Sequence, residues 1–247
     1  MTILTITGDC LIEVPKLAPA SVDMMLADLP YGQTQNGWDR IIDIPRMWDC
    51  LRHVAKPEAA MALMAAQPFA AHLICSNLKE FRYDLIWRKN KPTGFANARR
   101  RPLRNHEHVL IFYRAAPVYF PQKTEGHKPG NKATRRSMGP NYGDMAANTY
   151  GGNTDRFPLS VQDFPIINND DPGKFHPTQK PVALMEWLIR SYTAPGATVL
   201  DCTMGSGTTG IACLNTGRSF IGIEINPEYA AAAERRIFQH EPLQAVG

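Results

Sequence analysis

The sequence has 247 residues, of which 44% are apolar and 20% charged, with a formal net charge of +4, as in an ordinary globular protein. No apolar run approaches the roughly 18 residues of a membrane-spanning helix, and the first residues alternate Ile or Leu with Thr instead of forming a signal peptide, so we expect a cytoplasmic protein with no membrane partner. The five cysteines are an odd set without a CxxC pair, which argues against a disulfide framework and a zinc site.

Alternating strand and helix patterns at both ends of the chain predict an α/β fold, a mostly parallel twisted sheet with helices on both faces. The first half is expected to hold strands at 2–7 and 22–28, a helix at 45–54, a strand or buried helix at 59–65, a helix at 69–77, and strands at 83–87 and 108–113. The pattern does not separate strand from helix at 59–65. The last part is expected to hold helices at 182–191, 208–216 and 227–239 and strands at 198–202 and 219–223.

The middle of the chain differs from both ends. Residues 115–173 are rich in Gly, Asn, Pro, Thr and charge, which predicts an irregular insertion without a large core of its own. Between positions 88 and 136 there are 13 Lys or Arg against two acidic residues, a local net charge of +11. Such a segment attracts polyanions, and a solvated basic face without a ligand is the alternative.

A glycine loop follows the predicted strand that ends at Asp201. Gly205, Gly207 and Gly210 match GxGxxG before a predicted helix, and Glu224 ends the next strand 19 residues after Gly205. Glycines let the backbone approach a ligand, the helix N-terminus offers free N–H groups, and the acid can accept both hydroxyls of a ribose. The pattern predicts a nucleoside-bearing cofactor, against the alternative of a tight turn that happens to be rich in glycine.

Two features favour S-adenosylmethionine over a nicotinamide dinucleotide. Only 23 residues follow Glu224, too few for the second mononucleotide-binding half that a dinucleotide needs. The carboxylate of Asp201 can pair with the α-ammonium group of S-adenosylmethionine, which has no pyrophosphate.

A third motif, Asp28, Leu29, Pro30 and Tyr31, follows the apolar strand at 22–28. Together with the glycine loop and the His-Pro-Thr-Gln-Lys-Pro block at 176–181, it resembles the DNA amino-methyltransferases that make N6-methyladenine or N4-methylcytosine. Members carry Asp, Asn or Ser, then Pro-Pro, then Tyr, Phe or Trp. Leu29 stands here in place of the first proline and supplies the same backbone carbonyl.

The order of the blocks, with the catalytic motif before the cofactor loop, is that of the β group of this family. The resemblance implies a Rossmann-like methyltransferase fold in permuted order. Glu107, within the block 105–113, resembles the strand that precedes the target-recognition region. The chain is therefore expected to divide into a catalytic half at 1–114, a target-recognition insertion at 115–173, and an S-adenosylmethionine-binding half at 174–247.

The resemblance also assigns roles to residues. The Asp28 carboxylate and the Leu29 carbonyl would accept the two amino hydrogens of the target base, and Tyr31 would stack on the extruded base; the catalytic set is Asp28, Leu29, Pro30 and Tyr31. Asp201 and the glycine loop would hold the methionine end of the cofactor, Glu224 its ribose, Asp9 and Cys10 its adenine, and Thr178 and Lys180 its carboxylate. A turn aspartate at Asp9 and a solvated lysine at Lys180 are the alternatives. The full cofactor-binding set is Asp9, Cys10, Asp28, Thr178, Lys180, Asp201, Gly205, Gly207, Thr208 and Glu224.

The resemblance implies methylation of adenine N6 in double-stranded DNA by base flipping, in a prokaryotic or phage-encoded protein. N4-cytosine methylation is the first alternative, RNA or protein-glutamine methylation is weaker, and a DNA-binding protein without catalysis is the alternative from another class. No metal is expected. A homodimer and a cognate restriction enzyme are open as partners. The residues expected to meet DNA phosphates are Arg99, Arg100, Arg101, Arg104, Arg135 and Arg136.

Overall fold

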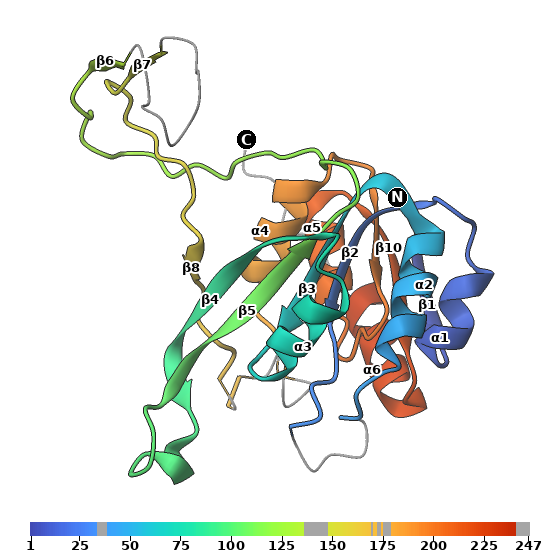
Figure 1. The fold of residues 1–247 in the computed structure, drawn as a ribbon. Coiled ribbons are helices and arrows are strands. Elements are labelled where there is room, and N and C mark those ends of the chain that lie inside the picture. The colour runs from blue at the N-terminus through green and yellow to red at the C-terminus, as the bar shows by residue number, and fades with distance from the viewer. Residues whose placement is uncertain (34–38, 136–147, 169, 172–173, 175–178, 241–247) are drawn as a thin grey trace. The chain divides into compact units, whose positions relative to one another are not determined.

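The structure is a computed structural model of residues 1–247, and it describes residues 1–33, 39–135, 148–168, 170–171, 174 and 179–240. Its centre is an eight-stranded sheet (Figure 1) in the order β1-β10-β9-β2-β3-β5-β4-β8. The strands are β1 (Ile3–Thr7), β2 (Val22–Asp28), β3 (Ala55–Ala65), β4 (Phe81–Thr93), β5 (Arg104–Phe112), β8 (Val161–Asp163), β9 (Thr198–Asp201) and β10 (Ser219–Glu224).

The sheet is mostly parallel. All neighbours from β1 through β10, β9 and β2 to β3 are parallel, β5 runs antiparallel to β3 and β4, and β8 is parallel to β4. The helices are α1 (Cys10–Glu13), α2 (Ile44–Val54), α3 (Phe69–Ser76), α4 (Val182–Tyr192), α5 (Thr208–Thr216) and α6 (Pro227–Phe238), with short 3-10 turns η1 (Val14–Lys16) and η2 (Phe95–Asn97). No described helix is long and apolar enough to cross a membrane.

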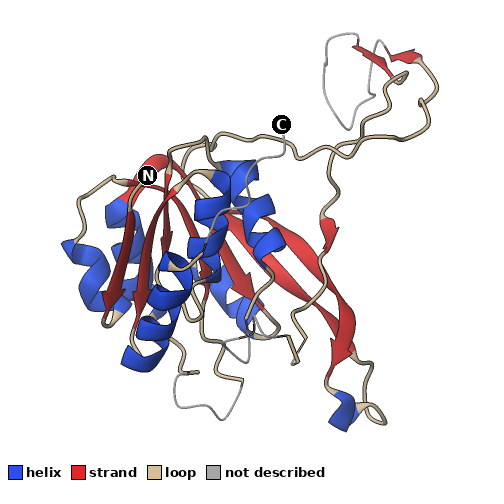
Figure 2. Ribbon diagram, turned by 180° about the vertical axis from the view of Figure 1, so that it is seen from behind, coloured by secondary structure: helices blue, strands red, loops and turns tan. Residues whose placement is uncertain are grey.

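Two hydrophobic layers hold the helices on opposite faces of the sheet (Figures 1 and 2). Residues of α1, α2 and α3 pack in one layer and residues of α4, α5 and α6 in the other. In β2, Met25 and Ala27 belong to the first layer and Met24 and Leu26 to the second. Burial on both faces explains why this strand is a continuous apolar run and not an alternating one.

The expected elements are confirmed, with differences at their ends. Residues 59–65 lie in a strand, β3, which begins at Ala55. The strands expected at 83–87 and 108–113 belong to a longer hairpin, β4–β5. The added residues are mostly exposed and polar, so no apolar pattern indicated them. The four-residue helix α1 and the three-residue strand β8 are too short to give a periodic signal and were not predicted.

The chain forms two compact units. Residues 121–159 are a small unit that contains the antiparallel pair β6 (Ala133–Arg135) and β7 (Asn148–Tyr150) and an ion pair between Lys123 and Asp155 at 2.7 Å. The rest of the chain is the unit that holds the large sheet. The small unit lies within the span 115–173; the division into catalytic, target-recognition and cofactor-binding parts stays a prediction.

The order of the sheet creates a crevice at the carboxyl ends of its strands. The chain leaves β2 toward β3 on one side, and it leaves β9 toward β10 on the other. Ligands of open α/β sheets bind where the strand order reverses in this way. Asp28 and Asp201, far apart in sequence, end two neighbouring strands at this point.

Candidate active site

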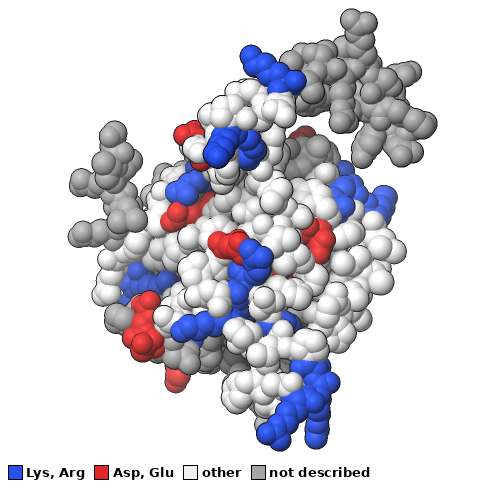
Figure 3. All heavy atoms as spheres, turned by 90° about the vertical axis from the view of Figure 1, so that its left-hand side faces the viewer, with Lys and Arg blue, Asp and Glu red and all other residues white. Residues whose placement is uncertain are grey.

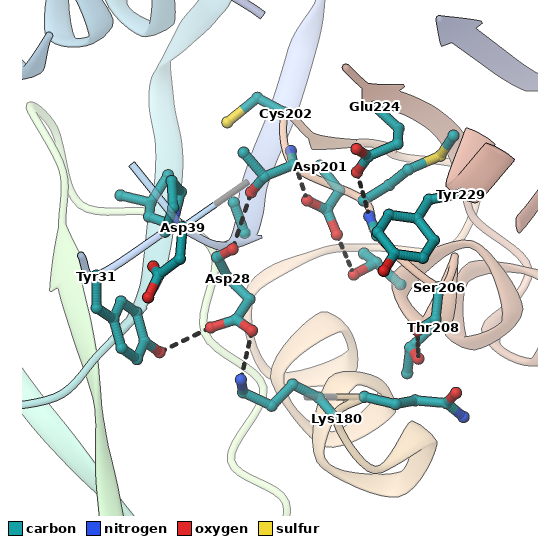
Figure 4. Close-up of a pocket in the computed structure, with 18 of the residues that line it drawn as sticks. Asp28, Tyr31, Asp39, Lys180, Asp201, Cys202, Ser206, Thr208, Glu224 and Tyr229 are labelled. Carbon is teal, nitrogen blue, oxygen red and sulfur yellow. Dashed lines mark hydrogen bonds and ion pairs between the residues drawn. The ribbon is translucent and has the colours of Figure 1, made fainter. Parts of the chain in front are cut away.

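A pocket of about 870 Å³ lies at the carboxyl ends of β1, β10, β9 and β2 (Figure 4). Pockets that bind small molecules commonly have volumes of roughly 300–1,000 Å³. The loop after each of the four strands contributes to its wall. The residues from these loops and strand ends include Gly8, Asp9, Cys10, Asp28, Leu29, Pro30, Tyr31, Asp201, Cys202, Thr203, Gly205, Ser206, Glu224 and Ile225.

The Asp28 carboxylate is held from two sides. The Tyr31 hydroxyl donates to Oδ1 at 2.7 Å, and the ammonium group of Lys180 donates to Oδ2 (Figure 4). Thr203, from the loop after β9, donates its hydroxyl to the Asp28 backbone carbonyl at 3.0 Å. These contacts fix the carboxylate at the junction of β2 and β9, where it borders the pocket.

Tyr31 is oriented by its own packing. Its ring stacks on Phe69 with centroids 5.5 Å apart and an interplanar angle of 25°. Burial and the nearby Asp28 charge raise the pKa of Tyr31 well above its usual value, so its hydroxyl stays protonated and donates to Asp28. Stacking of Tyr31 on an extruded base stays a prediction.

The loop after the motif is tied back by Asp39, which the sequence did not single out. Asp39 accepts hydrogen bonds from the backbone N–H groups of Gly32 at 2.8 Å and Gln33 at 2.9 Å. It is buried and lines the pocket (Figure 4). An isolated aspartate six or seven residues from its partners gives no sequence signal. Residues 34–38 lie outside the described residues.

The glycine loop is fastened to Glu224. Gly205 and Gly207 have positive φ values of 49° and 72°, a region that favours glycine. Gly205 N–H donates to Glu224 Oε2 at 3.0 Å, and the Asn226 N–H donates to Oε1 at 2.9 Å. The acid that ends β10 therefore shapes the loop after β9 and borders the pocket at the same time.

Asp201 is the most enclosed carboxylate of the site. It accepts hydrogen bonds from Thr203 N–H at 3.1 Å and from the Thr209 hydroxyl at 2.6 Å. Burial raises the pKa of Asp201 to about 7; the two hydrogen bonds oppose this effect, and the charges of Asp28 and Glu224 add to it. A nearby cation would restore its charged form.

The other predicted cofactor residues are found in different settings. Asp9 caps α1, since its Oδ1 accepts from Leu11 N–H at 2.8 Å, and Cys10 beside it is buried. The Thr208 hydroxyl contacts Ser206 at 3.1 Å and Arg236 at 3.2 Å. Thr178 lies outside the described residues. The ammonium group of Lys180 contacts Asp28, and its contact with a cofactor stays a prediction.

The donors of S-adenosylmethionine match the acceptors of this edge. Asp9, Glu224 and Asp201 lie at the carboxyl ends of three adjacent strands, β1, β10 and β9. An adenine amino group, two ribose hydroxyls and an α-ammonium group need acceptors in a similar succession. The buried Asp201, whose pKa is raised to about 7 mainly by burial, is suited to a cationic partner. The residues present therefore fit the cofactor.

The predicted DNA-binding arginines are only partly within the described residues. Arg99, Arg100 and Arg101 are exposed at the tip of the β4–β5 hairpin, and Arg104 lines the pocket. Figure 3 shows Lys and Arg side chains gathered over the end of this hairpin, at the bottom of the view. The side chain of Arg135 and the whole of Arg136 lie outside the described residues. Among the described residues, no group of three His, Cys, Asp or Glu could hold a metal ion.

A mostly parallel sheet with a glycine loop after β9 and an acid at the end of β10 is typical of Rossmann-like, S-adenosylmethionine-dependent methyltransferases. The family model for DNA methylases of the N6 and N4 type matches residues 22–235. The chain belongs to this family, so it is a DNA methyltransferase that uses S-adenosylmethionine.

Individual relatives agree with this assignment. The DNA adenine methyltransferase YhdJ of Escherichia coli (strain K12) is 30% identical over 245 residues, covering 94% of this chain and 81% of that protein. The structure of the M1.HpyAVI–SAM complex is similar with a TM-score of 0.65 and 26% identity, covering 95% of this chain and 100% of that one. The PvuII cytosine-N4-specific DNA methyltransferase has a TM-score of 0.72 and 16% identity, covering 99% and 89%, which shows a shared fold alone.

Proposed function

We propose that this protein methylates N6 of adenine in double-stranded DNA. The observation that carries the proposal is Asp28, a carboxylate held at the border of the pocket by Tyr31 and Lys180. Aspartate at this position is commoner in the adenine group of the family that the motif resembles. The 30% identity to a DNA adenine methyltransferase supports the same base.

Asp28 and Leu29 would make the amino group reactive. The exocyclic nitrogen of adenine is a poor nucleophile because its lone pair is delocalised into the ring. The Asp28 carboxylate and the Leu29 carbonyl would accept its two hydrogens and favour a pyramidal nitrogen. When bound, S-adenosylmethionine supplies the methyl group: the nitrogen lone pair forms the new N–C bond, and the C–S bond breaks with its electron pair left on sulfur. The nitrogen then loses one proton, which Asp28 is positioned to take.

The recessed position of Asp28 would require the target base to leave the DNA double helix. Asp28 has a side chain that is 25% exposed, and Lys180 beside it is 8% exposed. An amino group inside a duplex cannot reach such a recessed carboxylate, so the target would be extruded at a cost of a few kcal/mol. We infer that the ring of Tyr31 offsets part of this cost by contacting the base.

The test identifies the methylated base and the role of Asp28 together. Genomic DNA from cells that express the protein is digested to nucleosides, whose masses are measured by mass spectrometry. Modification-sensitive sequencing gives the sequence context of the methylated base. We expect N6-methyladenine, and we expect Asp28→Ala to abolish transfer while cofactor affinity stays within roughly tenfold, because Asp28 binds the base amino group. Near-normal turnover by a folded Asp28→Ala protein would contradict the assignment of Asp28.

N4-cytosine methylation is the second candidate. Its support is that the family model covers DNA methylases of the N4 type as well as the N6 type. The same two acceptors could bind the amino group of cytosine. Detection of N4-methylcytosine without N6-methyladenine would replace the first proposal by the second.

A further inference from the structure

Lys180 lies between two carboxylates in the wall of the pocket. Its ammonium group donates to Asp28 Oδ2, and it is 3.6 Å from Oε2 of Glu107 on β5. The side chains of Lys180 and Glu107 are 8% and 11% exposed. A buried cation at this position can change partner with a small movement of its flexible side chain.

Only one carboxylate oxygen of Glu107 accepts a hydrogen bond from the described residues. Lys89 on β4 donates to Oε1, and Lys89 also lies 4.7 Å from the centroid of the Trp87 ring. Oε2 is buried and accepts no hydrogen bond from the described residues. The ammonium group of Lys180 is its ion-pair partner at 3.6 Å, beyond hydrogen-bond distance, and a buried acceptor that lacks a hydrogen bond requires an explanation.

The contact between Lys180 and Asp28 conflicts with catalysis. During transfer the target nitrogen gains positive charge directly beside the Asp28 carboxylate. Like charges within contact distance of one carboxylate repel strongly where little water screens them. An ammonium group that stays on Asp28 would therefore oppose the charge that the reaction creates, and it would compete for the carboxylate with the amino hydrogens.

We propose that Lys180 moves from Asp28 to Oε2 of Glu107 when the target amino group enters, which makes Glu107 a positioning residue for methyl transfer. The inference rests on the proposed transfer at Asp28 and holds for either base. Lys180 fixes the carboxylate of Asp28 before the base arrives. Glu107 then takes the ammonium group and compensates its charge.

The charges of the cluster support this exchange. Lys89, Glu107, Lys180 and Asp28 hold two positive and two negative charges, so the movement changes no net buried charge. Burial acts to lower the pKa of Lys180, but Asp28 and Glu107 outweigh it and keep the pKa above its usual value. Burial likewise acts to raise the pKa of Glu107, and Lys180 and Lys89 outweigh it. Both partners therefore stay charged, and the ion pair is available.

The experiment compares the methyl transfer of Glu107→Gln with that of the wild type, on an unmodified duplex that contains the recognition site. We expect kcat to fall by about tenfold or more, because Lys180 loses its second partner, while the KM for DNA and the cofactor affinity change by less than about threefold. Glu107→Asp should recover part of the loss. Glu80→Gln is the matched control, since Glu80 is also buried and paired, with Arg52 at 3.0 Å, but does not line the pocket.

A second comparison separates the exchange from a structural role of Glu107. In a Lys180→Met background there is no ammonium group to accept, so Glu107→Gln should lower kcat by less than about threefold. An equal loss in both backgrounds, or an unchanged kcat in Glu107→Gln alone, would overturn the proposal. A wild type that methylates no base would refute the proposed function instead, and that result is obtained before any variant is compared.

Discussion

Asp201 shows how burial sets the chemistry of one residue. Its carboxylate is enclosed under the glycine loop, and burial raises its pKa to about 7 despite two hydrogen bonds that favour the charged form. In the protein without cofactor, Asp201 is therefore mostly protonated below pH 7. A cationic group can pair with it only after the proton has left.

We expect this proton to make cofactor binding depend on pH. The free protein binds the proton with a pKa of about 7, and an ammonium group in contact would lower that pKa, so binding releases a proton. Affinity for S-adenosylmethionine should rise with pH by up to about tenfold per unit below pH 7 and level off above it. Calorimetric titration in buffers of different ionisation enthalpy measures both the affinity and the proton released.

Asp201→Asn is the control for this pH dependence. The amide keeps the shape of the side chain and does not titrate, so its affinity should be lower than that of the wild type at pH 8 and nearly constant down to about pH 5.5. A pH dependence that persists unchanged in Asp201→Asn would show that another group releases the proton.

Contacts in this site join residues that are near in the chain and residues that are far apart in it. The placement of Asp28, Asp201 and Glu224 at one pocket could be predicted because each ends a strand and belongs to a local motif. The contact of Lys180 with Asp28 spans 152 residues and involves two side chains to which the family resemblance gave different roles. Motifs give the residue types of a site, whereas the folded sheet decides which charges become partners.

At the scale of elements, the glycine loop is defined by packing as well as by backbone conformation. Gly207 caps the start of α5 and Gly217 its end, and both have φ of 72°. A Cβ atom at Gly207 would lie 2.9 Å from Ile237 Cδ1 and 3.1 Å from Ala233 Cβ, whereas a Cβ atom at Gly217 would meet nothing within 4 Å. The two positions therefore separate backbone strain from steric crowding.

We expect Gly207→Ala to lower the free energy of unfolding by about 1–3 kcal/mol more than Gly217→Ala. Both variants place alanine in the left-handed region at a similar cost, and only Gly207→Ala also forces α6 away from the loop. Urea unfolding of the two proteins measures the difference directly. Equal stabilities would show that Ile237 moves aside freely and that the glycine is needed only for its φ.

The elements themselves were largely predictable, and the exceptions share a physical cause. Strand β2 and helix α5 lie where their patterns indicated because each buries apolar residues along its whole length. The exposed ends of β4 and β5 pair with each other through the backbone, which no side-chain pattern reveals. Hydrophobic periodicity detects burial, and an exposed hairpin is built mainly from main-chain hydrogen bonds.

At the scale of the whole molecule, charge is distributed unevenly over the chain. The net charge is only +4, yet the segment from position 88 to 136 carries +11. The tip of the β4–β5 hairpin brings Arg99, Arg100 and Arg101 together in exposed positions, and Arg104 begins β5 at the wall of the pocket. A basic tip that continues into the pocket wall is suited to hold the phosphates that flank an extruded base.

We expect the hairpin arginines to contribute to DNA affinity through counterion release. The variant with Arg99, Arg100 and Arg101 replaced by Ala should bind a site-containing duplex more weakly at low salt. Its plot of log affinity against log salt should be shallower by about 0.9 for each lost phosphate contact, up to about 2.7. Fluorescence anisotropy over a series of NaCl concentrations gives this slope.

The control replaces two exposed basic residues away from the hairpin, Lys79 before β4 and Arg235 on α6, by Ala. If only the net charge of the protein mattered, this double variant would also flatten the slope, by about two thirds as much as the triple variant. If the hairpin contacts phosphates, the control keeps the wild-type slope. An unchanged slope for the triple variant would show that the hairpin arginines do not contact DNA phosphates. The basic residues of the 121–159 unit would then be the next candidates for these contacts.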